Sequence, residues 1–426
     1  MQQYSTYKPS GIEWLGDVPS HWKIVRIKDL LKDFGGDGFP IEKQGKKEGD
    51  FPFLKVSDIN GKDDFVSTAN NYIDEKELKQ NGWKIIPVFS MITAKVGEAL
   101  KKNHRKINLV DCCIDNNMMG LVIDDNKKLG MKYFFYLSKE IDFDFFEKPG
   151  TVPSLNMVLF RHYKIPQPLF NEQTAIASYL DQATANIDKV IATKQQQLEK
   201  LERYKKSKIH ECVTKGLNPN IKFKDSGIEW IGVIPERWKV ERIKDVVELR
   251  NIKTSEKSEE KDYIELEDIE QGTGRIIGFR DTTEVSSDVT IFKKGDVLFG
   301  KLRPYLAKYW LADRDGKCTG EIISFNCLKI YNAFFKYFIG SPKFIEICTA
   351  VSYGAKMPRV DWTRQIAYFY IAFPNIKEQK EIAEYLDNFC TNITNEKNII
   401  EKQITCLQQY RKSLIHECVT GKRKVI

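Results

Sequence analysis

The chain carries two copies of one framework, and this internal repeat constrains the fold more than any single motif. SGIEWLGDVPSHWKIVRIKD at 10–29 returns as SGIEWIGVIPERWKVERIKD at 226–245. Two further boxes return in the same order: QTAIASYLD at 173–181 as QKEIAEYLD at 379–387, and IHECVT at 209–214 unchanged at 415–420. A repeated framework predicts two similar modules in one chain. It also predicts a binding partner with two-fold repetition.

The segments between the repeated boxes do not resemble each other. Residues 30–168 and 246–374 show almost no residue-for-residue match. The boxes before them are offset by 216 residues (226 − 10) and the boxes after them by 206 (379 − 173), so the length difference lies within the inserts. Two divergent inserts in a constant frame predict modules that share an architecture and differ in target.

Length and composition describe a folded protein of two to three ordinary domains. The chain has 426 residues, of which 42% are hydrophobic and 12% aromatic, and this argues against disorder. The formal charge of +8 permits a nucleic-acid or acidic partner without proving one, because many solvated surfaces carry such a charge.

The cysteines and the N-terminus predict a reduced cytoplasmic environment. Nine cysteines are scattered without framework spacing, which is typical of reduced thiols, and no CxxC pair indicates a structural zinc site. The first residues lack the charged-then-apolar pattern of a signal peptide, and no stretch of about 18 apolar residues occurs. We expect a soluble, cytoplasmic protein.

Each copy of the frame ends in a long predicted helix. Residues 173–214 contain neither glycine nor proline, and apolar residues recur at steps of three and four, as in a coiled-coil seam. The expected seam runs through Ile176, Leu180, Ala183, Ile187, Val190, Leu198, Leu201 and Ile209, and in the second copy through Ile382, Leu386, Phe389, Ile393, Ile400, Ile404, Leu407, Tyr410 and Leu414. A helix of about 40 residues is on the order of 60 Å long.

Single apolar stripes on two long helices must be buried, and each helix is the natural partner of the other. We therefore predict an intramolecular antiparallel helix pair; the alternative is that each helix packs only on its neighbouring domain. The spacer and partner-docking role is assigned to Ile176, Leu180, Ile187, Leu201, Ile382, Leu386, Ile393 and Leu407.

The expected fold class is α/β (α+β), with two mixed α/β domains joined by the helix pair in a pseudo-two-fold repeat. The inserts show short β-type runs such as FPFLKVSDI, GLVID, DYIELEDI and GDVLFGKL, with a helix over 132–140. Predicted boundaries are a first recognition domain at 1–170, a first helical region at 171–217, a second recognition domain at 218–376 and a second helical region at 377–426.

Catalytic signatures are absent from the sequence. The chain contains no GxxxxGK[ST] phosphate loop, no GxSxG, no HExxH and no Asn/Asp-Pro-Pro-aromatic motif of amino-methyltransferases. GTGRIIG at 272–278 misses the dinucleotide-binding pattern, and a hairpin turn explains it better. His210 and His416 lie inside identical boxes, and we expect them to serve the frame.

A buried strand that runs into a basic loop is the strongest local signal. GDVLFGKLRPYLAK at 295–308 supplies cations and a tyrosine that can contact DNA phosphates or base edges. The same region of the first insert, 89–106, also passes from a strand to a basic run. The expected contacts are Lys301, Arg303, Tyr305 and Lys308 in the second insert, and Lys95, Lys101, Lys102 and Arg105 in the first. The alternative is a solvated basic loop in each insert.

A second pair of loops precedes the closing strand of each insert. PGTVPSLN at 149–156 and YGAKMPRVD at 353–361 both contain glycine and proline, and only the second is basic. We expect Lys356 and Arg359 to contact DNA from the second loop, and Thr151, Ser154 and Asn156 to contact bases from the first.

These segments together resemble a known family. The SGIEWLG opening, GDVLFGKLRPYLAK, the EQxxIAxYLD helix starts at 172 and 378, and the IHECVTGK ending resemble the specificity (S) subunit of Type I restriction–modification systems. The resemblance covers essentially the whole chain, twice over. It departs from the family in the first insert, which lacks the Arg-Pro-Tyr loop found at 303–305.

The resemblance implies a non-catalytic subunit that binds double-stranded DNA. Each target-recognition domain is expected to read one half of a split site, while the helical spacer sets their separation and docks two modification (M) subunits. No cofactor is expected on this chain. S-adenosylmethionine for adenine-N6 methylation is expected on the M subunits, and ATP and Mg on the restriction (R) subunits that cleave.

Two other functions remain open at this point. The chain can be a coiled-coil scaffold that recruits two copies of one partner without touching DNA. It can also be a nuclease or methyltransferase itself, although the missing motifs argue against this.

Overall fold

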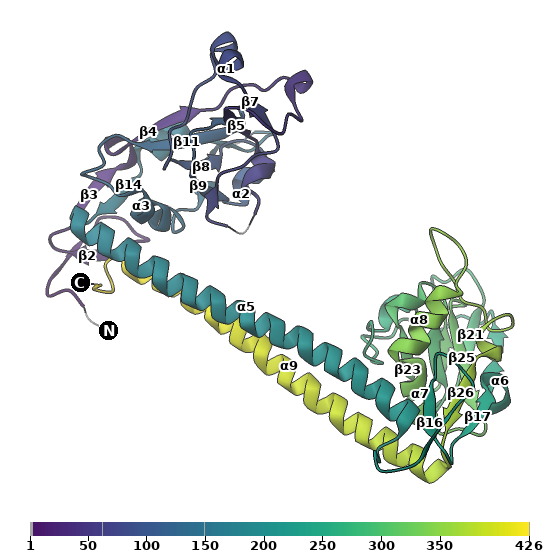
Figure 1. The fold of residues 1–426 in the computed structure, drawn as a ribbon. Helices are drawn as coiled ribbons and strands as arrows, with labels where there is room; N and C mark the ends of the chain where they lie inside the picture. Colours follow the sequence, from purple (N-terminus) through teal and green to yellow (C-terminus); the bar gives the residue numbers. More distant parts are fainter. Residues whose placement is uncertain (1–2, 62, 149, 426) are drawn as a thin grey trace. The chain divides into compact units, whose positions relative to one another are not determined.

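The computed structural model describes residues 3–61, 63–148 and 150–425. Its contacts divide the chain into two units, Met1–Ala192 with Ile404–Ile426 (unit 1) and Thr193–Gln403 (unit 2). Each unit contains one insert, one copy of the frame and one part of each long helix (Figure 1).

Unit 1 is built around a five-stranded sheet in the order β4-β11-β8-β9-β6 and a three-stranded sheet in the order β10-β5-β7. The strands are β4 (Leu31–Gly35), β5 (Phe51–Leu54), β6 (Phe65–Val66), β7 (Tyr72–Ile73), β8 (Met91–Ala94), β9 (Arg105–Asn108), β10 (Cys113–Ile114) and β11 (Met118–Ile123). Two-stranded ladders join β1 (Tyr7–Pro9) to β2 (Asp17–Pro19), β3 (Lys23–Arg26) to β14 (Lys164–Gln167), and β12 (Glu147–Lys148) to β13 (Ser154–Leu155). The short helices are α1 (Glu75–Asn81), α2 (Glu98–Lys101), α3 (Met131–Ser138) and α4 (Met157–His162).

Unit 2 holds two four-stranded sheets, in the orders β18-β25-β22-β23 and β19-β21-β24-β20. The strands are β18 (Val247–Arg250), β19 (Lys253–Thr254), β20 (Tyr263–Ile264), β21 (Val289–Phe292), β22 (Val297–Gly300), β23 (Tyr309–Leu311), β24 (Gly316–Cys318) and β25 (Ile322–Cys327). The ladders join β15 (Phe223–Asp225) to β16 (Val233–Pro235), and β17 (Lys239–Arg242) to β26 (Tyr370–Phe373). The short helices are α6 (Ile243–Val246), α7 (Asn332–Ile339) and α8 (Pro342–Ala350).

The two inserts share one sheet despite their unmatched sequences. The strand order β4-β11-β8-β9 of unit 1 has the same connections as β18-β25-β22-β23 of unit 2. The registers agree, because Met118 opposes Ala94 in unit 1 as Ile322 opposes Gly300 in unit 2. The predicted α/β class with an internal two-fold repeat is therefore confirmed.

Each unit has its own core, and the repeated boxes lie within it. Trp22 of the opening box is 0% exposed and packs with Cys418 and Val419 at the end of α9. Its mate Trp238 is 2% exposed and packs with Cys212 and Val213 at the end of α5. The framework occurs in both units because its apolar residues fill two equivalent cores. Each core buries the large aromatic surface of a tryptophan.

The two long helices are α5 (Phe170–Lys215) and α9 (Ile376–Val419). A buried glutamine near each start accounts for the repeated QxxIAxYLD box. Gln173 accepts a hydrogen bond from the Gly130 N–H at 2.9 Å, and Gln379 accepts one from the Tyr331 N–H at 2.7 Å. Each glutamine therefore ties the start of the helix that follows its sheet (α3 or α7) to the first turn of the long helix.

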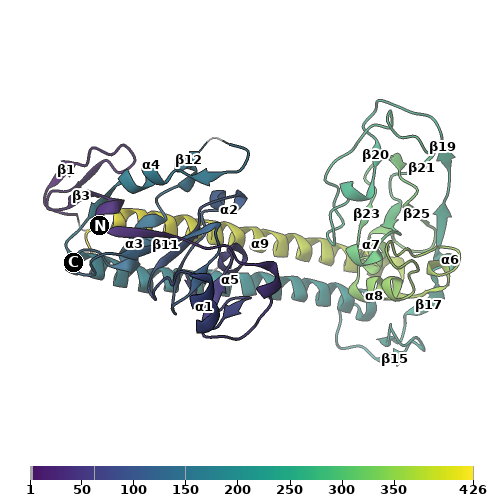
Figure 2. The same ribbon diagram turned by 90° about the horizontal axis from the view of Figure 1, so that it is seen from above.

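Within each unit, α5 and α9 lie side by side and antiparallel (Figures 1 and 2). In unit 1, Arg411 pairs with Asp188 at 3.0 Å. In unit 2, Lys397 pairs with Glu202 at 2.8 Å, and the Tyr204 ring lies 5.4 Å from the Phe389 ring. Contacts of late α5 with early α9, and of early α5 with late α9, confirm the predicted antiparallel pair over the alternative in which each helix packs only on its own domain.

Two expected seam residues are exposed. Val190 is 44% exposed and Tyr410 is 48% exposed. The half-buried Ile191 packs against the unit 1 core in the turn where Val190 was expected. The strict three–four spacing fails there because a straight helix has 3.6 residues per turn, and its apolar stripe drifts from a 3.5-residue repeat.

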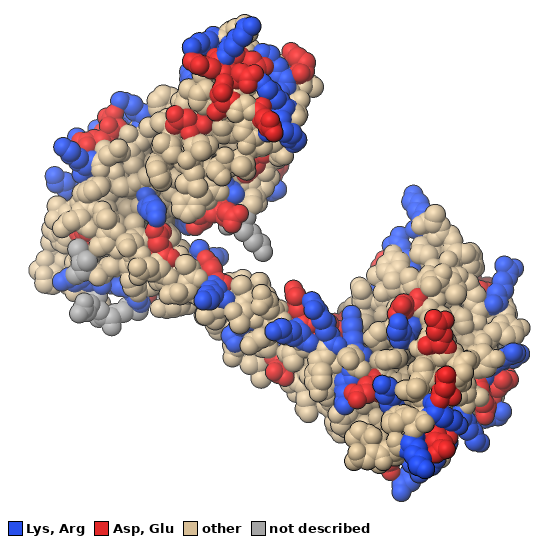
Figure 3. All heavy atoms as spheres, viewed as in Figure 1, with Lys and Arg blue, Asp and Glu red and all other residues tan. Residues whose placement is uncertain are grey.

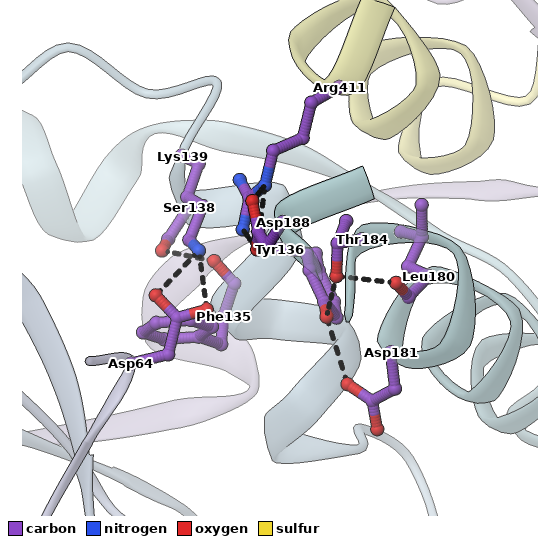
Figure 4. A network of polar contacts seen from close by, with 10 residues as sticks. All are labelled: Asp64, Phe135, Tyr136, Ser138, Lys139, Leu180, Asp181, Thr184, Asp188 and Arg411. Atoms are coloured by element: carbon purple, nitrogen blue, oxygen red, sulfur yellow. Dashed lines mark hydrogen bonds and ion pairs between the residues drawn. The ribbon is translucent and has the colours of Figure 1, made fainter. Parts of the chain in front are cut away.

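Polar bonds attach each short helix to the long one beside it. Tyr136 of α3 donates to the Asp181 carboxylate of α5 at 2.9 Å, whereas Lys139, directly after α3, pairs at 2.9 Å with Asp64, which precedes β6 (Figure 4). Tyr337 of α7 binds Asp387 at 2.5 Å, which repeats the tyrosine–aspartate contact in unit 2. In both units burial is the largest cause that raises the pKa of the tyrosine, so it stays a donor.

Candidate nucleic-acid interface

In unit 2, the predicted strand-loop leaves the sheet at the end of β22. The chain makes a short 3-10 turn at Pro304–Leu306, bounded by two residues in the left-handed region. Arg303 has φ 50° and Ala307 has φ 47°. Non-glycine residues rarely adopt this conformation, which is found most often where surrounding bonds enforce it.

The bonds that hold this loop come from the second predicted loop. Leu302 forms a β-bridge with Arg359, the Arg303 N–H donates to the Pro358 carbonyl at 2.7 Å, and the Val360 N–H donates to the Lys301 carbonyl at 3.0 Å. Two segments that are some fifty residues apart in the sequence therefore form one surface in unit 2.

Unit 1 contains the same junction. Val96 bridges Ser154, the Gly97 N–H donates to the Pro153 carbonyl at 2.7 Å, and the Leu155 N–H donates to the Lys95 carbonyl at 2.9 Å. Gly97, at φ 82°, occupies the place of Arg303. The backbone of the candidate interface is thus repeated, while the side chains on it differ.

The side chains of the unit 2 interface fall into two groups. Arg303 and Lys356 are exposed, and among the described residues neither forms an ion pair with an acidic side chain. Both are therefore available to a ligand. Arg359 is held by Glu321, with Nε 3.1 Å from Oε2, and this carboxylate raises the pKa of the Arg359 guanidinium. Arg359 therefore braces the junction.

Three more unit 2 residues have partial roles in the fold. Lys301 is half-buried at the end of β22. Lys308 donates to the Leu266 carbonyl at 2.6 Å. Tyr305 is 49% exposed and lines a cleft of about 840 Å³ between α8, the 270–275 hairpin and the end of α5. That hairpin closes with a bridge between Ile269 and Ile276, which confirms the predicted turn at GTGRIIG.

In unit 1, the exposed candidates are Lys101, Lys102 and Thr151, while Lys95 and Ser154 are half-buried. Lys101 lies 3.7 Å from Glu98, a loose exposed pair. Asn156 caps α4, since its side-chain oxygen accepts from the Val158 and Leu159 N–H groups. Pro149, the first residue of the predicted loop, lies outside the described residues.

The burial of Arg105 contradicts the prediction that it contacts DNA. Its side chain is buried, it donates to the Ile141 carbonyl, and its guanidinium lies 4.2 Å from the centre of the Phe143 ring. Burial lowers the pKa of Arg105 to about 10. The basic run hid this because 105 is the first residue of β9 and faces the interior, so we no longer assign it to DNA.

The residues assigned a spacer and partner-docking role are mostly buried, which fits the spacer part of that prediction and contradicts the docking part. Ile176, Leu180, Ile382 and Leu386 are 0% exposed, and Ile187 and Ile393 are buried as well. Leu201 and Leu407 are half-buried. These side chains hold the helices to each other and to their unit, so a partner docked on the spacer must use other residues.

Sequence reasoning missed the apolar residues on the second loops. Val152 is 57% exposed, Tyr353 54% and Met357 44%. The available signal was an apolar residue before a proline in both loops, VP at 152–153 and MP at 357–358. Search by charge alone passed over it.

The surface charges are mixed on the visible face of each unit, where Lys and Arg alternate with Asp and Glu (Figure 3). Among the described residues, no group of histidine, cysteine and acidic side chains could hold a metal ion. Within the same residues, no helix is long and apolar enough to span a membrane.

Comparisons with known proteins identify the family. The model of the Type I restriction modification DNA specificity domain matches residues 19–202 and again residues 235–404. The chain therefore belongs to this family, and it is a specificity subunit of the Type I restriction–modification class.

Individual relatives agree over nearly the full length. The Type I restriction enzyme MjaVIII specificity subunit of Methanocaldococcus jannaschii is 27% identical over 428 residues, covering 96% of this chain and 94% of that protein. The EcoDI specificity subunit of Escherichia coli is 22% identical, covering 91% and 85%.

Solved structures share the fold at low identity. A chain from a structure on complex assembly and conformational transition of the type I R-M system has a TM-score of 0.71 at 13% identity, covering 94% of this chain and 98% of that one. The HsdS subunit from Thermoanaerobacter tengcongensis has a TM-score of 0.58 at 14% identity, covering 95% and 98%.

Proposed function

We propose that this specificity subunit reads a bipartite DNA site, with one half recognised by each unit. The observation that carries the proposal is the repeated junction of strand-loop and second loop, which presents Arg303 and Lys356 in unit 2 and Lys101, Lys102 and Thr151 in unit 1. The same main-chain junction with different side chains is what two readers of different sequences require.

Affinity in this proposal comes largely from phosphate contacts, and sequence from a few side chains. Exposed lysines on both junctions neutralise phosphates, so binding weakens as salt rises. Arg303 projects from a strained, tightly bonded loop and can fork to a guanine edge.

The partners follow from the family. Two M subunits dock on the α5–α9 spacer and methylate adenine N6 with S-adenosylmethionine, and R subunits add ATP- and Mg-dependent cleavage. The chain itself is non-catalytic in this proposal, so the target base is taken from the stack by the M subunit. A cytoplasmic location stays a prediction.

Methyl transfer to defined duplexes tests the proposal. The purified chain, its M partner and labelled S-adenosylmethionine are mixed with duplexes that carry both half-sites, either one, or neither. Methylation only when both halves are present at one spacing supports bipartite reading. Methylation of any duplex alike would support the scaffold function instead.

The spacer claim has its own test. Inserting four residues after Lys194, with four in α9 to keep the helices paired, should change the number of unspecified base pairs between half-sites. An unchanged spacing in methylome sequencing would contradict the role of the helices as a ruler.

A further inference from the structure

The second loop of each junction is a hairpin with a defined tip. In unit 2, Tyr353 and Arg359 pair across the base through two backbone hydrogen bonds of 3.0 and 2.9 Å. In unit 1, Lys148 pairs with Ser154 between β12 and β13. We name residues 354–358 the unit 2 tip and residues 150–153 the unit 1 tip.

Both tips end in an exposed aliphatic residue followed by proline. Met357–Pro358 in unit 2 corresponds to Val152–Pro153 in unit 1, because the residue after each proline is the one that pairs across the hairpin base. Met357 is 44% exposed and Val152 is 57% exposed. Inserts that otherwise do not match thus share an apolar side chain at one structural position.

The tips are fixed in place by the strand-loops. The carbonyls of Pro153 and Pro358 each accept a hydrogen bond of 2.7 Å, from Gly97 and Arg303 respectively. The residue two positions after each proline donates back to a lysine carbonyl at the end of the central strand. Each aliphatic side chain therefore stands on a braced backbone beside the residues assigned to DNA.

The shared position argues for a task that does not depend on sequence. Side chains that read different bases would differ in chemical character, as Arg303 and Gly97 do, whereas Met357 and Val152 are both apolar. An exposed apolar side chain costs free energy in water unless a partner covers it. Lys356 lies directly before Met357 and Thr151 directly before Val152, so the covering partner carries hydrogen-bond acceptors next to an apolar surface, as stacked bases beside phosphates do.

We propose that the aliphatic–proline tip of each unit enters the base stack of its half-site as a wedge. This rests on the proposed function and adds a step to it. Opening one base step costs a few kcal/mol, and apolar wedges such as methionine and proline supply the contacts that offset it. The wedge lowers the cost of extruding the adenine that the M subunit methylates.

Fluorescence of 2-aminopurine tests the wedge in the assembled methyltransferase of this chain with two M subunits. The analogue replaces the target adenine of one half-site at a time, and its emission rises when it leaves the stack. Met357→Ser should reduce that rise about tenfold at one half-site, and Val152→Ser should do the same at the other, as expected for a loss of unstacking assistance. Met357→Leu, which keeps an aliphatic wedge, should retain the signal.

Two controls separate the wedge from affinity and folding. Leu328→Ser and Ile41→Ser alter side chains that are 60% and 84% exposed elsewhere on the same units, and both should leave the emission unchanged. A mismatch opposite the analogue, which loosens the stack beforehand, should restore the signal of Met357→Ser.

The results that overturn the inference are distinct from failure of the proposed function. Full emission with Met357→Ser and Val152→Ser would refute the wedge while specific methylation continued. A changed methylome motif in either variant would assign the tip to base reading and also refute it. A wild-type complex without site-specific methylation would instead refute the bipartite function itself.

Discussion

The junctions of unit 1 and unit 2 share their main-chain hydrogen bonds and differ in the side chains that they present. The bonds from Gly97 to Pro153 and from Arg303 to Pro358 are both 2.7 Å long, yet one loop carries a glycine at φ 82° and the other an arginine at φ 50°. The first position of the neighbouring strand holds Arg105 in unit 1 and Tyr309 in unit 2, both buried. Hydrogen bonds of the main chain fix the architecture, so side chains are free to diverge with the target.

The largest effect should come from the residues that the two units share. Trp22→Ala and Trp238→Ala each empty a core and should lower the free energy of unfolding by about 3–5 kcal/mol. Hydrogen exchange followed by peptide mass should show lost protection only in the unit that carries the change. Equal loss in both units from either variant would contradict two separate cores.

Substitutions at the two equivalent buried residues, Arg105 in unit 1 and Tyr309 in unit 2, should differ in their effect on stability. Arg105→Met leaves the Ile141 carbonyl without its donor and should lower the free energy of unfolding by about 1–3 kcal/mol. Tyr309→Phe is the matched control, and urea denaturation should show little change for it. DNA affinity lost without a stability change in Arg105→Met would return Arg105 to the interface.

Substitutions at Arg303 and Gly97 should have the next largest effect, on the binding of DNA. Arg303→Gly keeps the left-handed backbone, because glycine adopts it freely, and should weaken binding of one half-site about tenfold through loss of a base contact. Gly97→Arg should leave that half-site unchanged. Fluorescence anisotropy with single half-site duplexes provides the measurement, and unaltered binding by Arg303→Gly would remove Arg303 from the interface.

A smaller effect is expected for a phosphate contact. Lys356→Gln should lower the slope of log affinity against log salt by about 1 and weaken all sequences alike. Lys402→Gln on α9 is the control, with no change of slope expected. A sequence-dependent loss with Lys356→Gln would show that the lysine reads bases.

The smallest effect concerns the repeated histidines. His416 lies 2.7 Å from Glu140, whereas the Nδ1 of His210 is buried without a partner among the described residues. Burial lowers the pKa of His210, with Lys343 and Lys215 adding to it. As the pH falls, His210 therefore binds a proton in the unfolded chain before it does so in the folded chain. Unit 2 loses stability as the pH falls below about 6.5. His210→Gln should flatten the fall in melting temperature between pH 7.5 and 5.5, and an identical fall would contradict the assignment.

Much of the fold could be predicted because the repeat acts as an internal alignment. The repeated boxes indicated two similar modules, and the glycine-free helices indicated the antiparallel pair, whereas the cores around Trp22 and Trp238 are known from the structure alone. Val190 and Tyr410 were misplaced because helix drift cannot be read from spacing alone. Both errors lie where the apolar stripe of a long helix turns away from its partner.

The sequence located the loops of the candidate site, but it did not identify all of the residues that they expose. The pairing of the two loops in each insert depends on long-range backbone bonds, such as that from Arg303 to Pro358, which no local pattern encodes. Arg105 was assigned to DNA because a basic run does not show which side chain faces inward. Val152 and Met357 were missed because exposure of an apolar residue is a property of the folded chain.

Methylome sequencing of a host that carries the whole system shows whether each unit reads its own half-site. Unit 2 is changed at three exposed or half-exposed positions of its junction, Lys301, Arg303 and Lys356, each to glutamine. We expect one half of the methylated motif to be altered or relaxed, while the other half and the spacing between them stay the same. A change in both halves, or in neither, would contradict a reader in each unit.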